Sequence, residues 1–435
     1  MIALLFSKHH QKHITHLSFW RWVGSEAALL FLFCIFTLAS CTTEESEDVN
    51  DINKQTLLVF MPWSGSQTSQ GLYSYFQQNL DSIESAIITE RKMNGRVLVF
   101  LSTSANQSEL YEITYGNGEI QHIPVQTYSG NFYTTADGIT QILNEVKSYA
   151  YALNYAMIIG CHGNGWTYKD DWEDYPNNAK GNALFSNGAS MAKSSANGFG
   201  TYPITRFYGS VSDINNYATD IPVLAQGIKN AGMKMQYILF DDCYMSNVET
   251  AYELKDATNF LMGSTSEIMS IGMPYQTMWT SLATSTPAYA TAVNAFKTFY
   301  SNYEYPYGTM SVIDCRKLDR LAQQMKMINQ NYTFDESLRD SLQVLDGFHT
   351  PIFYDMGDYV TRLCKNEDIL NDFDATLSQV IKASTYTDSI YSYLYKEGPK
   401  YINVRHFSGL TISDPSLNSV AVKGREKTAW WKATH

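Results

Sequence analysis

The chain has 435 residues, of which 44% are hydrophobic and 17% are charged, so it is long enough to bury a large core. Its formal net charge is -12, and no run of Lys or Arg occurs in the body of the chain. Because binding to nucleic-acid phosphates needs a basic surface, this charge balance excludes a nucleic-acid partner.

The first forty residues have the features of a targeting segment rather than of a folded domain. A basic, histidine-rich start is followed by an apolar run over 27–38, which is too short to span a bilayer comfortably. The run leads into Leu-Ala-Ser-Cys at 38–41, which resembles a bacterial lipoprotein box. We therefore expect residues 1–40 to be a lipoprotein signal peptide and Cys41 to be lipidated. The alternative is an ordinary signal peptide followed by a chance cysteine.

An acidic tether follows over 41–55 and would hold the folded body away from a membrane. Acidic residues directly after the lipidated cysteine resemble the export tags of Bacteroidetes surface lipoproteins. The expected location is thus the cell envelope, at the outer membrane and facing either the periplasm or the outside. The lipid anchor would be the only contact with the membrane, and the sequence indicates no oligomeric state.

Short runs rich in Val, Ile, Leu, Phe and Tyr alternate with helical patterns, which favours an α/β domain with a largely buried sheet. Strands are predicted at 56–62, 96–102, 110–115, 155–160, 237–241 and 260–264. Helices are predicted at 74–91, 136–149 and 220–231, the last ending at Gly232. Beyond about residue 300 we expect a strand at 308–313, helices near 335–344 and 354–364, and a final segment at 401–412.

Two regions are expected after the tether: a main domain over 56–300 and a smaller C-terminal α/β region over 301–435 that packs on it. Inside the main domain, residues 167–210 are rich in Gly, Asn, Ser and Ala. A loop of that length within a compact domain is uncommon unless it is functional or disordered.

A histidine follows one of the predicted strands directly. The apolar run at 157–160 leads through Cys161 to His162 and then into Gly-Asn-Gly-Trp. Functional groups are often presented at the carboxyl ends of such strands, and Gly163 lets the backbone turn sharply there. A single histidine at a strand end is more often structural, although histidine is also the usual general base near neutral pH.

A cysteine follows a second buried strand, in Asp-Asp-Cys-Tyr-Met-Ser-Asn-Val-Glu at 241–249. Ser246 and Glu249 have the spacing of a capping box, so a helix is expected to begin there. A helix N-terminus beside Cys243 would lower the pKa of its thiol. The alternative is a small buried hydrophobic residue, which the two preceding carboxylates argue against. His162 and Cys243 at one edge of the sheet would suffice for acyl transfer, with the amides of Gly163 and Cys243 as oxyanion donors.

The two segments together resemble the clostripain family of cysteine peptidases, relatives of gingipains, legumain and caspases. The family pattern is His-Gly-x-Gly-Trp and then Asp-Ala-Cys-x-Met-x-x-x-Glu, each after an apolar strand. Similar later elements are Ser-Thr-Ser-Glu-Ile at 264–268, Gly-Met-Pro-Tyr at 272–275 and Ser-Gly-Leu-Thr-Ile at 408–412. The resemblance runs from about residue 56 to the C-terminus. It implies a caspase-like three-layer α/β sandwich with a mostly parallel central sheet.

The resemblance also implies a chemistry. His162 would be the general base and Cys243 the nucleophile of an endopeptidase that cleaves proteins or peptides after Arg or Lys. Family members place an aspartate two residues before the cysteine in the substrate pocket, which here is Asp241. Asp242 stands where the family usually has a small residue, so it is a second candidate for substrate binding and would raise the thiol pKa.

Family members commonly cut themselves between the histidine and the cysteine. Lys180 and Lys193 are the candidate cut sites here, although a flexible surface loop is an equal alternative. The resemblance implies no required cofactor, but some relatives need calcium. The acidic cluster at 170–174 offers oxygen ligands, yet its spacing matches no defined calcium loop and favours a solvated acidic turn.

A function of another class stays open, namely a catalytically silent surface lipoprotein that binds peptide or glycan through its aromatic side chains. The presence of both His162 and Cys243 argues against it. A metallohydrolase is disfavoured because no two histidines have helical ligand spacing, and no Gly-x-Ser-x-Gly motif indicates a serine hydrolase.

Overall fold

A nine-stranded sheet forms the centre of the computed structural model, which describes residues 52–67, 70–173, 214–304, 307–394 and 400–435. The predicted signal peptide, Cys41, most of the tether, Lys180 and Lys193 lie outside these residues. Residues 53–435 form one compact unit, so the sheet and its covering helices can be described together.

The strand order is β10-β8-β7-β6-β5-β1-β2-β3-β4, and the five central strands run parallel. The strands are β1 (Gln55–Met61), β2 (Arg96–Ser104), β3 (Gln107–Gly116), β4 (Glu119–Ser129), β5 (Asn154–Ile159), β6 (Met235–Phe240), β7 (Thr258–Gly263), β8 (Thr309–Asp314) and β10 (Ile381–Tyr386). The central strands are continuous apolar runs because helices cover both of their faces.

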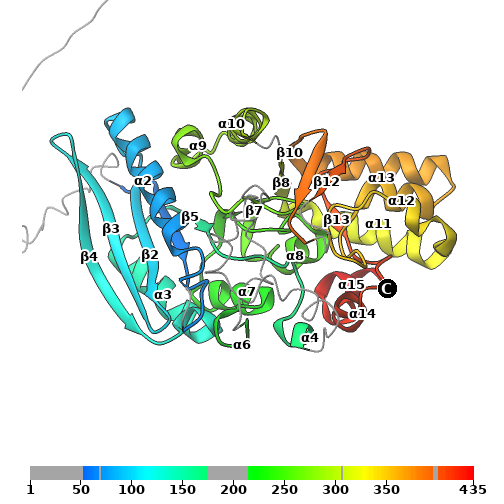
Figure 1. The fold of residues 1–435 in the computed structure, drawn as a ribbon, viewed down its shortest axis with the longest axis horizontal. Helices are drawn as coiled ribbons and strands as arrows, with labels where there is room; N and C mark the ends of the chain where they lie inside the picture. Colours follow the sequence, from blue (N-terminus) through cyan, green and yellow to red (C-terminus); the bar gives the residue numbers. More distant parts are fainter. Residues whose placement is uncertain (1–51, 68–69, 174–213, 305–306, 395–399) are drawn as a thin grey trace, which may run out of the picture. The chain divides into compact units, whose positions relative to one another are not determined.

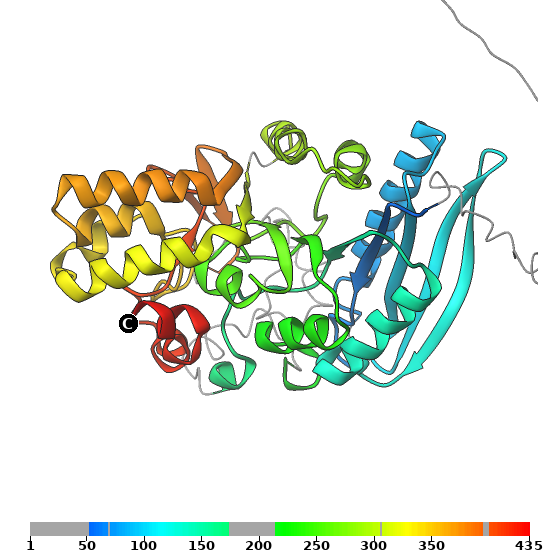
Figure 2. The same cartoon turned by 180° about the vertical axis from the view of Figure 1, so that it is seen from behind.

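Helices cover one face of the sheet with α2, α9 and α10 and the other face chiefly with α3, α7 and α8 (Figures 1 and 2). Their bounds are α2 (Tyr73–Glu90), α9 (Tyr275–Leu282), α10 (Tyr289–Ser301), α3 (Ala136–Tyr149), α7 (Ile221–Asn230) and α8 (Val248–Glu253). Each helix buries an apolar stripe, as α3 does with Ile139, Ile142, Leu143 and Val146. The three-layer α/β architecture predicted from the sequence is therefore present.

The C-terminal residues extend this sheet and add helices beside it. Strands β8 and β10 form its far edge, and β10 runs antiparallel to β8. Further elements are α11 (Leu318–Asn331), α12 (Met356–Leu363), α13 (Glu367–Val380), α14 (Ser419–Gly424), α15 (Ala429–Thr434) and the short strands β9 (Tyr354–Asp355), β11 (Ser389–Ser392), β12 (Lys400–Asn403) and β13 (Thr411–Ile412).

One helix prediction was wrong, and strands β4 and β10 of the main sheet were not predicted. The expected helix at 335–344 is only a 3-10 turn over Glu336–Ser341, because no residue of that turn is buried and Leu342, which is buried, already has extended backbone angles. Strand β4 was missed because most of its residues are exposed and show no clear alternation. The signal for it was the dipeptide Asn117-Gly118, whose positive φ angles of 54° and 87° are typical of a tight hairpin turn.

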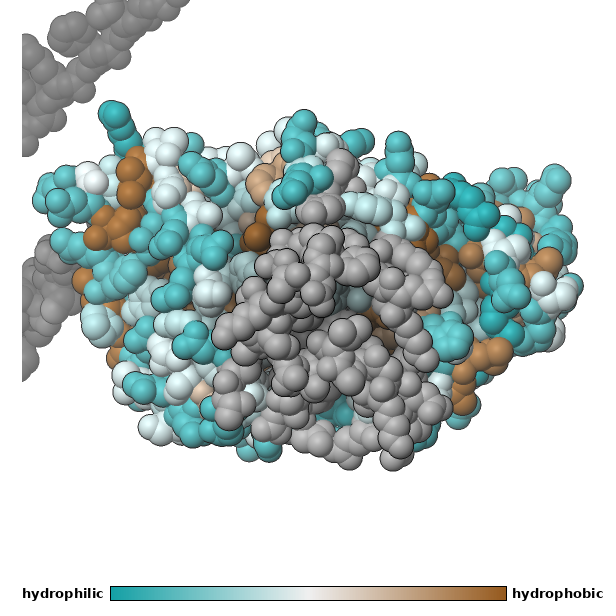
Figure 3. Space-filling view, in the orientation of Figure 1, coloured by the Kyte–Doolittle hydropathy of each residue, from teal (hydrophilic) through white to brown (hydrophobic). Residues whose placement is uncertain are grey.

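Hydrophilic residues cover most of the described surface on the face shown in Figure 3. Among the described residues, no helix combines the length and the apolar character needed to cross a bilayer.

Candidate active site

The segments that carry His162 and Cys243 leave the sheet side by side. Strands β5 and β6 are parallel neighbours in which Ile159 is paired with Phe240. The pairing continues one step further, since the amide of Asp241 donates to the carbonyl of Ile159 at 2.8 Å. His162 and Cys243 are equally far along the chain from the last residues of β5 and β6. They therefore lie at the same carboxyl edge of the sheet.

Gly163 brings the backbone of the histidine segment against that of the cysteine segment. A Cβ atom at Gly163 would lie 2.8 Å from the backbone nitrogen of Cys243 and 2.8 Å from Cβ of Asp242. Only glycine allows this approach without a shift of the backbone. The two amides that the sequence assigns to an oxyanion hole therefore come from adjoining segments.

The thiol of Cys243 is fully buried and faces the segment that follows β7. The amide of Ile268 donates a hydrogen bond to Sγ at 3.1 Å. A hydrogen bond donated to sulfur favours the thiolate over the thiol. The thiolate is the form that attacks a carbonyl carbon. His162 is also buried, with 4% of its surface exposed.

Tyr244, directly after Cys243, has a φ angle of 64°, which is uncommon for a residue with a side chain. Three hydrogen bonds hold it there. Its amide donates to Ser266 O at 2.9 Å, its carbonyl accepts from Asn247 Nδ2 at 2.6 Å, and its hydroxyl donates to Glu267 Oε1 at 2.9 Å. Such strained positions cluster at functional sites and persist only where the surroundings determine them. This turn therefore fixes the direction of the neighbouring thiol.

The helix predicted beside Cys243 is present, but its cap is not the predicted one. Helix α8 begins at Val248, and Asn247 is its N-cap, with Oδ1 accepting from the amide of Thr250 at 2.7 Å. Glu249 points elsewhere, because its Oε1 accepts from the amide of Ser413 at 2.7 Å. The capping-box interpretation of Ser246 and Glu249 was wrong, because the adjacent asparagine forms the cap.

The two aspartates before Cys243 have different partners. Oδ2 of Asp241 accepts a hydrogen bond from the hydroxyl of Tyr275 at 2.8 Å, and the residue is wholly buried. Oδ1 of Asp242 accepts from the amide of Cys161 at 2.5 Å, and the Cys161 thiol lies 3.4 Å from Oδ2. Asp242 thus holds the start of the histidine turn, which gives this departure from the family pattern a structural role.

A cavity of about 70 Å³ opens at this edge of the sheet, and His162, Gly163 and Asp242 line it. Its floor is apolar and includes Phe60 and Phe240. The cavity gives the imidazole segment a neighbouring space for part of a ligand.

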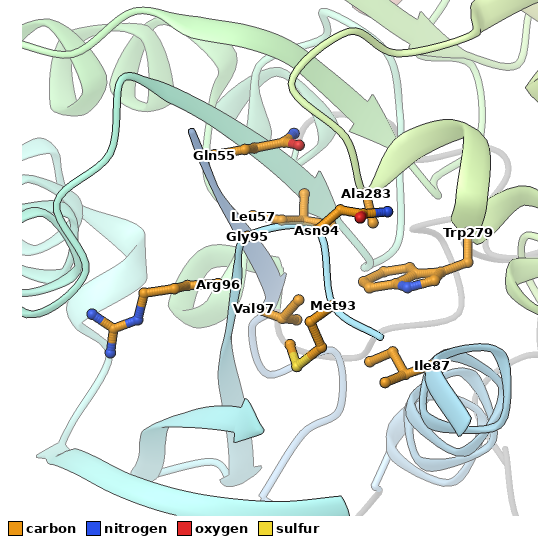
Figure 4. A pocket seen from close by; sticks show the side chains of 10 residues that line it. All are labelled: Gln55, Leu57, Ile87, Met93, Asn94, Gly95, Arg96, Val97, Trp279 and Ala283. Carbon is orange, nitrogen blue, oxygen red and sulfur yellow. The ribbon is translucent and has the colours of Figure 1, made fainter. Parts of the chain in front are cut away.

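A second and much smaller cavity, of about 10 Å³, lies at the opposite end of the strands (Figure 4). Gln55 and Arg96, the first residues of β1 and β2, line it together with Trp279 of α9. This cavity lies at the amino ends of the strands, whereas the candidate active site lies at their carboxyl ends. The two are therefore separate.

No group of His, Cys, Asp and Glu within the described residues could hold a metal ion. In the acidic cluster at 170–174, Asp171 is buried and its Oδ1 lies 2.7 Å from Nζ of Lys427. This carboxylate is committed to an ion pair, so the described part of the cluster does not support a calcium site.

Burial and the nearby Asp414 carboxylate raise the pKa of Glu249 to about 8. Burial also raises the pKa of Asp414 to about 7, against an opposing effect of Arg425. Two carboxyl groups that share a buried site disfavour each other's charged form. Glu249 is therefore a neutral acid near pH 7, although a free glutamate would be ionised.

Replacement of Glu249 by glutamine is expected to stabilise the fold increasingly as the pH rises from about 4.3 to about 8. The native carboxyl keeps its proton up to about pH 8, whereas the unfolded chain loses it near pH 4.3, so native stability falls between these values. Glutamine cannot ionise and avoids that loss. In urea titrations, the stability difference between variant and wild type should grow by on the order of 3 kcal/mol from about pH 5 to about pH 8.5. A difference that does not change with pH would contradict this assignment.

Similar proteins share both this fold and much of this sequence. A secreted C11 cysteine protease from Bacteroides thetaiotaomicron, called iotapain, is 40% identical, with a TM-score of 0.76, over 88% of this chain and 99% of that one. The chain belongs to the clostripain family. The family model for clostripain matches residues 204–413, and no curated protein matches the sequence.

Two more distant clostripain-family structures share the fold. An inactive zymogen C11 protease from Parabacteroides distasonis is 22% identical, with a TM-score of 0.68, over 88% of this chain and 99% of that one. A secreted C11 cysteine protease from Bacteroides thetaiotaomicron, in complex with an irreversible peptide inhibitor, is 18% identical, with the same TM-score, over 88% of this chain and 98% of that one. The resemblance stated from the sequence is confirmed, with its caspase-like fold, and the protein is a cysteine peptidase.

The structure places Gly163 against Asp242 and Cys243, and His162 comes directly before Gly163 in the chain. Asp241 lies directly beside them, facing Tyr275. Sequence reasoning missed the roles of Tyr275, Ile268 and Ser413 as hydrogen-bond partners. For Tyr275 a signal existed in the Gly-Met-Pro-Tyr motif, whereas no pattern indicated Ser413.

Proposed function

We propose that this clostripain-family peptidase hydrolyses peptide bonds after Arg or Lys, with His162 as general base and Cys243 as nucleophile. The observation that supports the proposal is the contact between the Gly163 backbone and Cys243 at the carboxyl edge of β5 and β6. The family membership and the presence of both residues favour this function over that of a silent peptide- or glycan-binding lipoprotein.

The chemistry begins when the imidazole of His162 takes the thiol proton of Cys243. The thiolate attacks the carbonyl carbon of the scissile bond, and the amides of Gly163 and Cys243 stabilise the oxyanion. His162 returns the proton to the leaving amine, which departs and leaves a thioester. Water, deprotonated by His162, then hydrolyses the thioester and frees the thiol. No cofactor enters these steps.

Asp241 is proposed as the partner of the substrate's cationic side chain. A buried carboxylate forms a strong charge-assisted contact once water is excluded, and the hydroxyl of Tyr275 fixes its orientation. Asp242 is also a candidate for substrate contact because it lines the cavity beside His162, although its carboxylate already accepts from Cys161.

Asp241→Asn should lower kcat/KM for peptides with Arg or Lys before the scissile bond by about 100-fold, because a buried charge pair contributes on the order of 3 kcal/mol. Cleavage after norleucine should not fall, since the variant keeps its shape and an oxygen for Tyr275. Fluorogenic peptides that differ only at this residue measure the preference. Wild type that fails to cleave any basic peptide would refute the basic specificity, and an unchanged preference in the variant would move the pocket away from Asp241.

Self-cleavage within 167–210, with Lys180 and Lys193 as cut sites, is proposed as the activating step. Only 167–173 of this segment is described, including α4 (Lys169–Glu173). The complete burial of Cys243 supports a step that opens the site, because a substrate cannot reach a thiol with no exposed surface.

The proposed location is the outer membrane, through a lipid on Cys41, with proteins or peptides as substrates. Calcium is proposed only as a modulator, and the assay above tests it when repeated with a chelator. An unchanged rate with chelator would remove calcium from the account.

A further inference from the structure

We propose that Glu249 and Ser413 are positioning residues, which form a buried connection between the turn that carries His162 and the helix that follows Cys243. The connection consists of two hydrogen bonds through the C-terminal part of the chain. The inference rests on the proposed catalytic pair and goes beyond it, because neither residue would touch the substrate.

The two hydrogen bonds run in series. Nε1 of Trp166 donates to Oγ of Ser413 at 2.8 Å, and the amide of Ser413 donates to Oε1 of Glu249 at 2.7 Å. All three residues are buried, with at most 3% of their surface exposed. Hydrogen bonds inside a protein are costly to break because water does not replace the lost partner.

The ends of this connection belong to the two catalytic segments. Trp166 closes the glycine-rich turn that begins with His162, and Glu249 lies in the first turn of α8, just after Cys243. Ser413 is held in place by β13, because the amide of Thr411 donates to the carbonyl of Ser246 at 3.1 Å. The C-terminal residues 411–413 thus bind both segments at once.

The catalytic turns also touch directly near this connection. A Cβ atom at Gly165 would lie 2.8 Å from Nδ2 of Asn247, the N-cap of α8. The fit leaves little room, so a small displacement of Trp166 would move Gly165 and, with it, the imidazole segment. Misplacement of reacting groups by about 1 Å can cost about 100-fold in rate.

The protonation state of Glu249 determines which substitution reproduces the charge and hydrogen bonding of the wild-type side chain. Its charged neighbour is the carboxyl of Asp414, which in turn lies near the guanidinium of Arg425, whose Nη1 donates to the carbonyl of Asp414 at 2.7 Å. Because Glu249 is a neutral acid near pH 7, Glu249→Gln preserves shape, charge and an acceptor oxygen for Ser413. Glu249→Leu fills a similar volume without an acceptor.

The matched control lies on the same helix. Oε2 of Glu253 accepts from the amide of Ala429 at 3.2 Å, so it too binds α8 to the C-terminal part of the chain. This contact is at the far end of α8 from Cys243. Glu253→Leu therefore removes another contact between α8 and the C-terminal part of the chain without touching the proposed connection.

The test measures kcat and KM of the full mature chain with a fluorogenic Lys peptide, together with the pH profile of Cys243 alkylation by iodoacetamide. Trp166→Phe, Ser413→Ala and Glu249→Leu should each lower kcat about 10- to 100-fold, with KM changed less than about threefold. They should also raise the apparent pKa of alkylation, because a displaced imidazole stabilises the thiolate less. Glu249→Gln and Glu253→Leu should stay within about threefold of wild type.

The proposal fails if folded Trp166→Phe and Ser413→Ala keep the wild-type kcat and alkylation profile, or if Glu253→Leu loses as much activity as Glu249→Leu. Should Glu249→Leu not fold, these two variants and Glu249→Gln decide the question. Failure of the catalytic pair itself has a different signature: wild type would remain active after complete alkylation of Cys243.

Discussion

Cys243→Ala is expected to lower kcat/KM for basic peptides by at least about 10⁴-fold, because it removes the atom that forms the acyl-enzyme. The substitution removes a small side chain, and the amide of Ile268 loses only one weak hydrogen-bond acceptor. The variant should therefore still fold. The wild-type chain is expected to purify as two fragments and the variant as one, since self-cleavage needs the same thiol. Rates with a fluorogenic Lys peptide and a denaturing gel measure both effects.

Cys315→Ala is the matched control, because Cys315 is equally buried but follows β8, away from the candidate site. It should keep wild-type activity and processing. Retained activity in Cys243→Ala, at any level above a few per cent, would show that another group is the nucleophile.

Gly163→Ala is expected to lower kcat by about 100- to 1,000-fold, because the added methyl group displaces the amide that is the proposed oxyanion donor, and the loss of such a donor has that typical cost. The added methyl group would press against the backbone nitrogen of Cys243 and Cβ of Asp242, each at 2.8 Å. Since both neighbours belong to the cysteine segment, they can only yield by moving the thiol or the histidine turn. Binding of peptide away from the scissile bond should change less, so kcat should fall more than KM rises.

Gly116→Ala provides the comparison, because a Cβ atom at Gly116 meets nothing within 4 Å. It should leave kcat unchanged. Equal activity of Gly163→Ala and wild type would mean that the close approach at Gly163 has no part in catalysis, and the oxyanion assignment would have to be abandoned.

The central sheet could be predicted from sequence because its strands are unbroken apolar runs, as at β1, β5 and β6. His162 and Cys243 were chosen as candidates because each follows such a run closely and matches a specific motif, and their catalytic role stays a prediction. Strand β4 escaped because it has mostly exposed residues and only the Asn117-Gly118 turn to mark it.

Long-range hydrogen bonds could not be predicted at all. Ser413 joins Trp166 to Glu249 from far along the chain, and nothing in its own neighbourhood indicates that role. The cap of α8 shows a different limit. Ser246 and Asn247 are both good capping residues, and only the local backbone decides between them.

The order of the strands determines what happens to a processed chain. Strand β5 precedes and β6 follows the segment with the proposed cut sites, yet the two strands are hydrogen-bonded neighbours in the middle of the sheet. Cleavage there would yield two polypeptides. The backbone hydrogen bonds between β5 and β6 would hold them together, as would the two hydrophobic cores to which both contribute residues. One piece would contribute the imidazole and the other the sulfur, so the mature enzyme would be an obligate heterodimer encoded by a single reading frame.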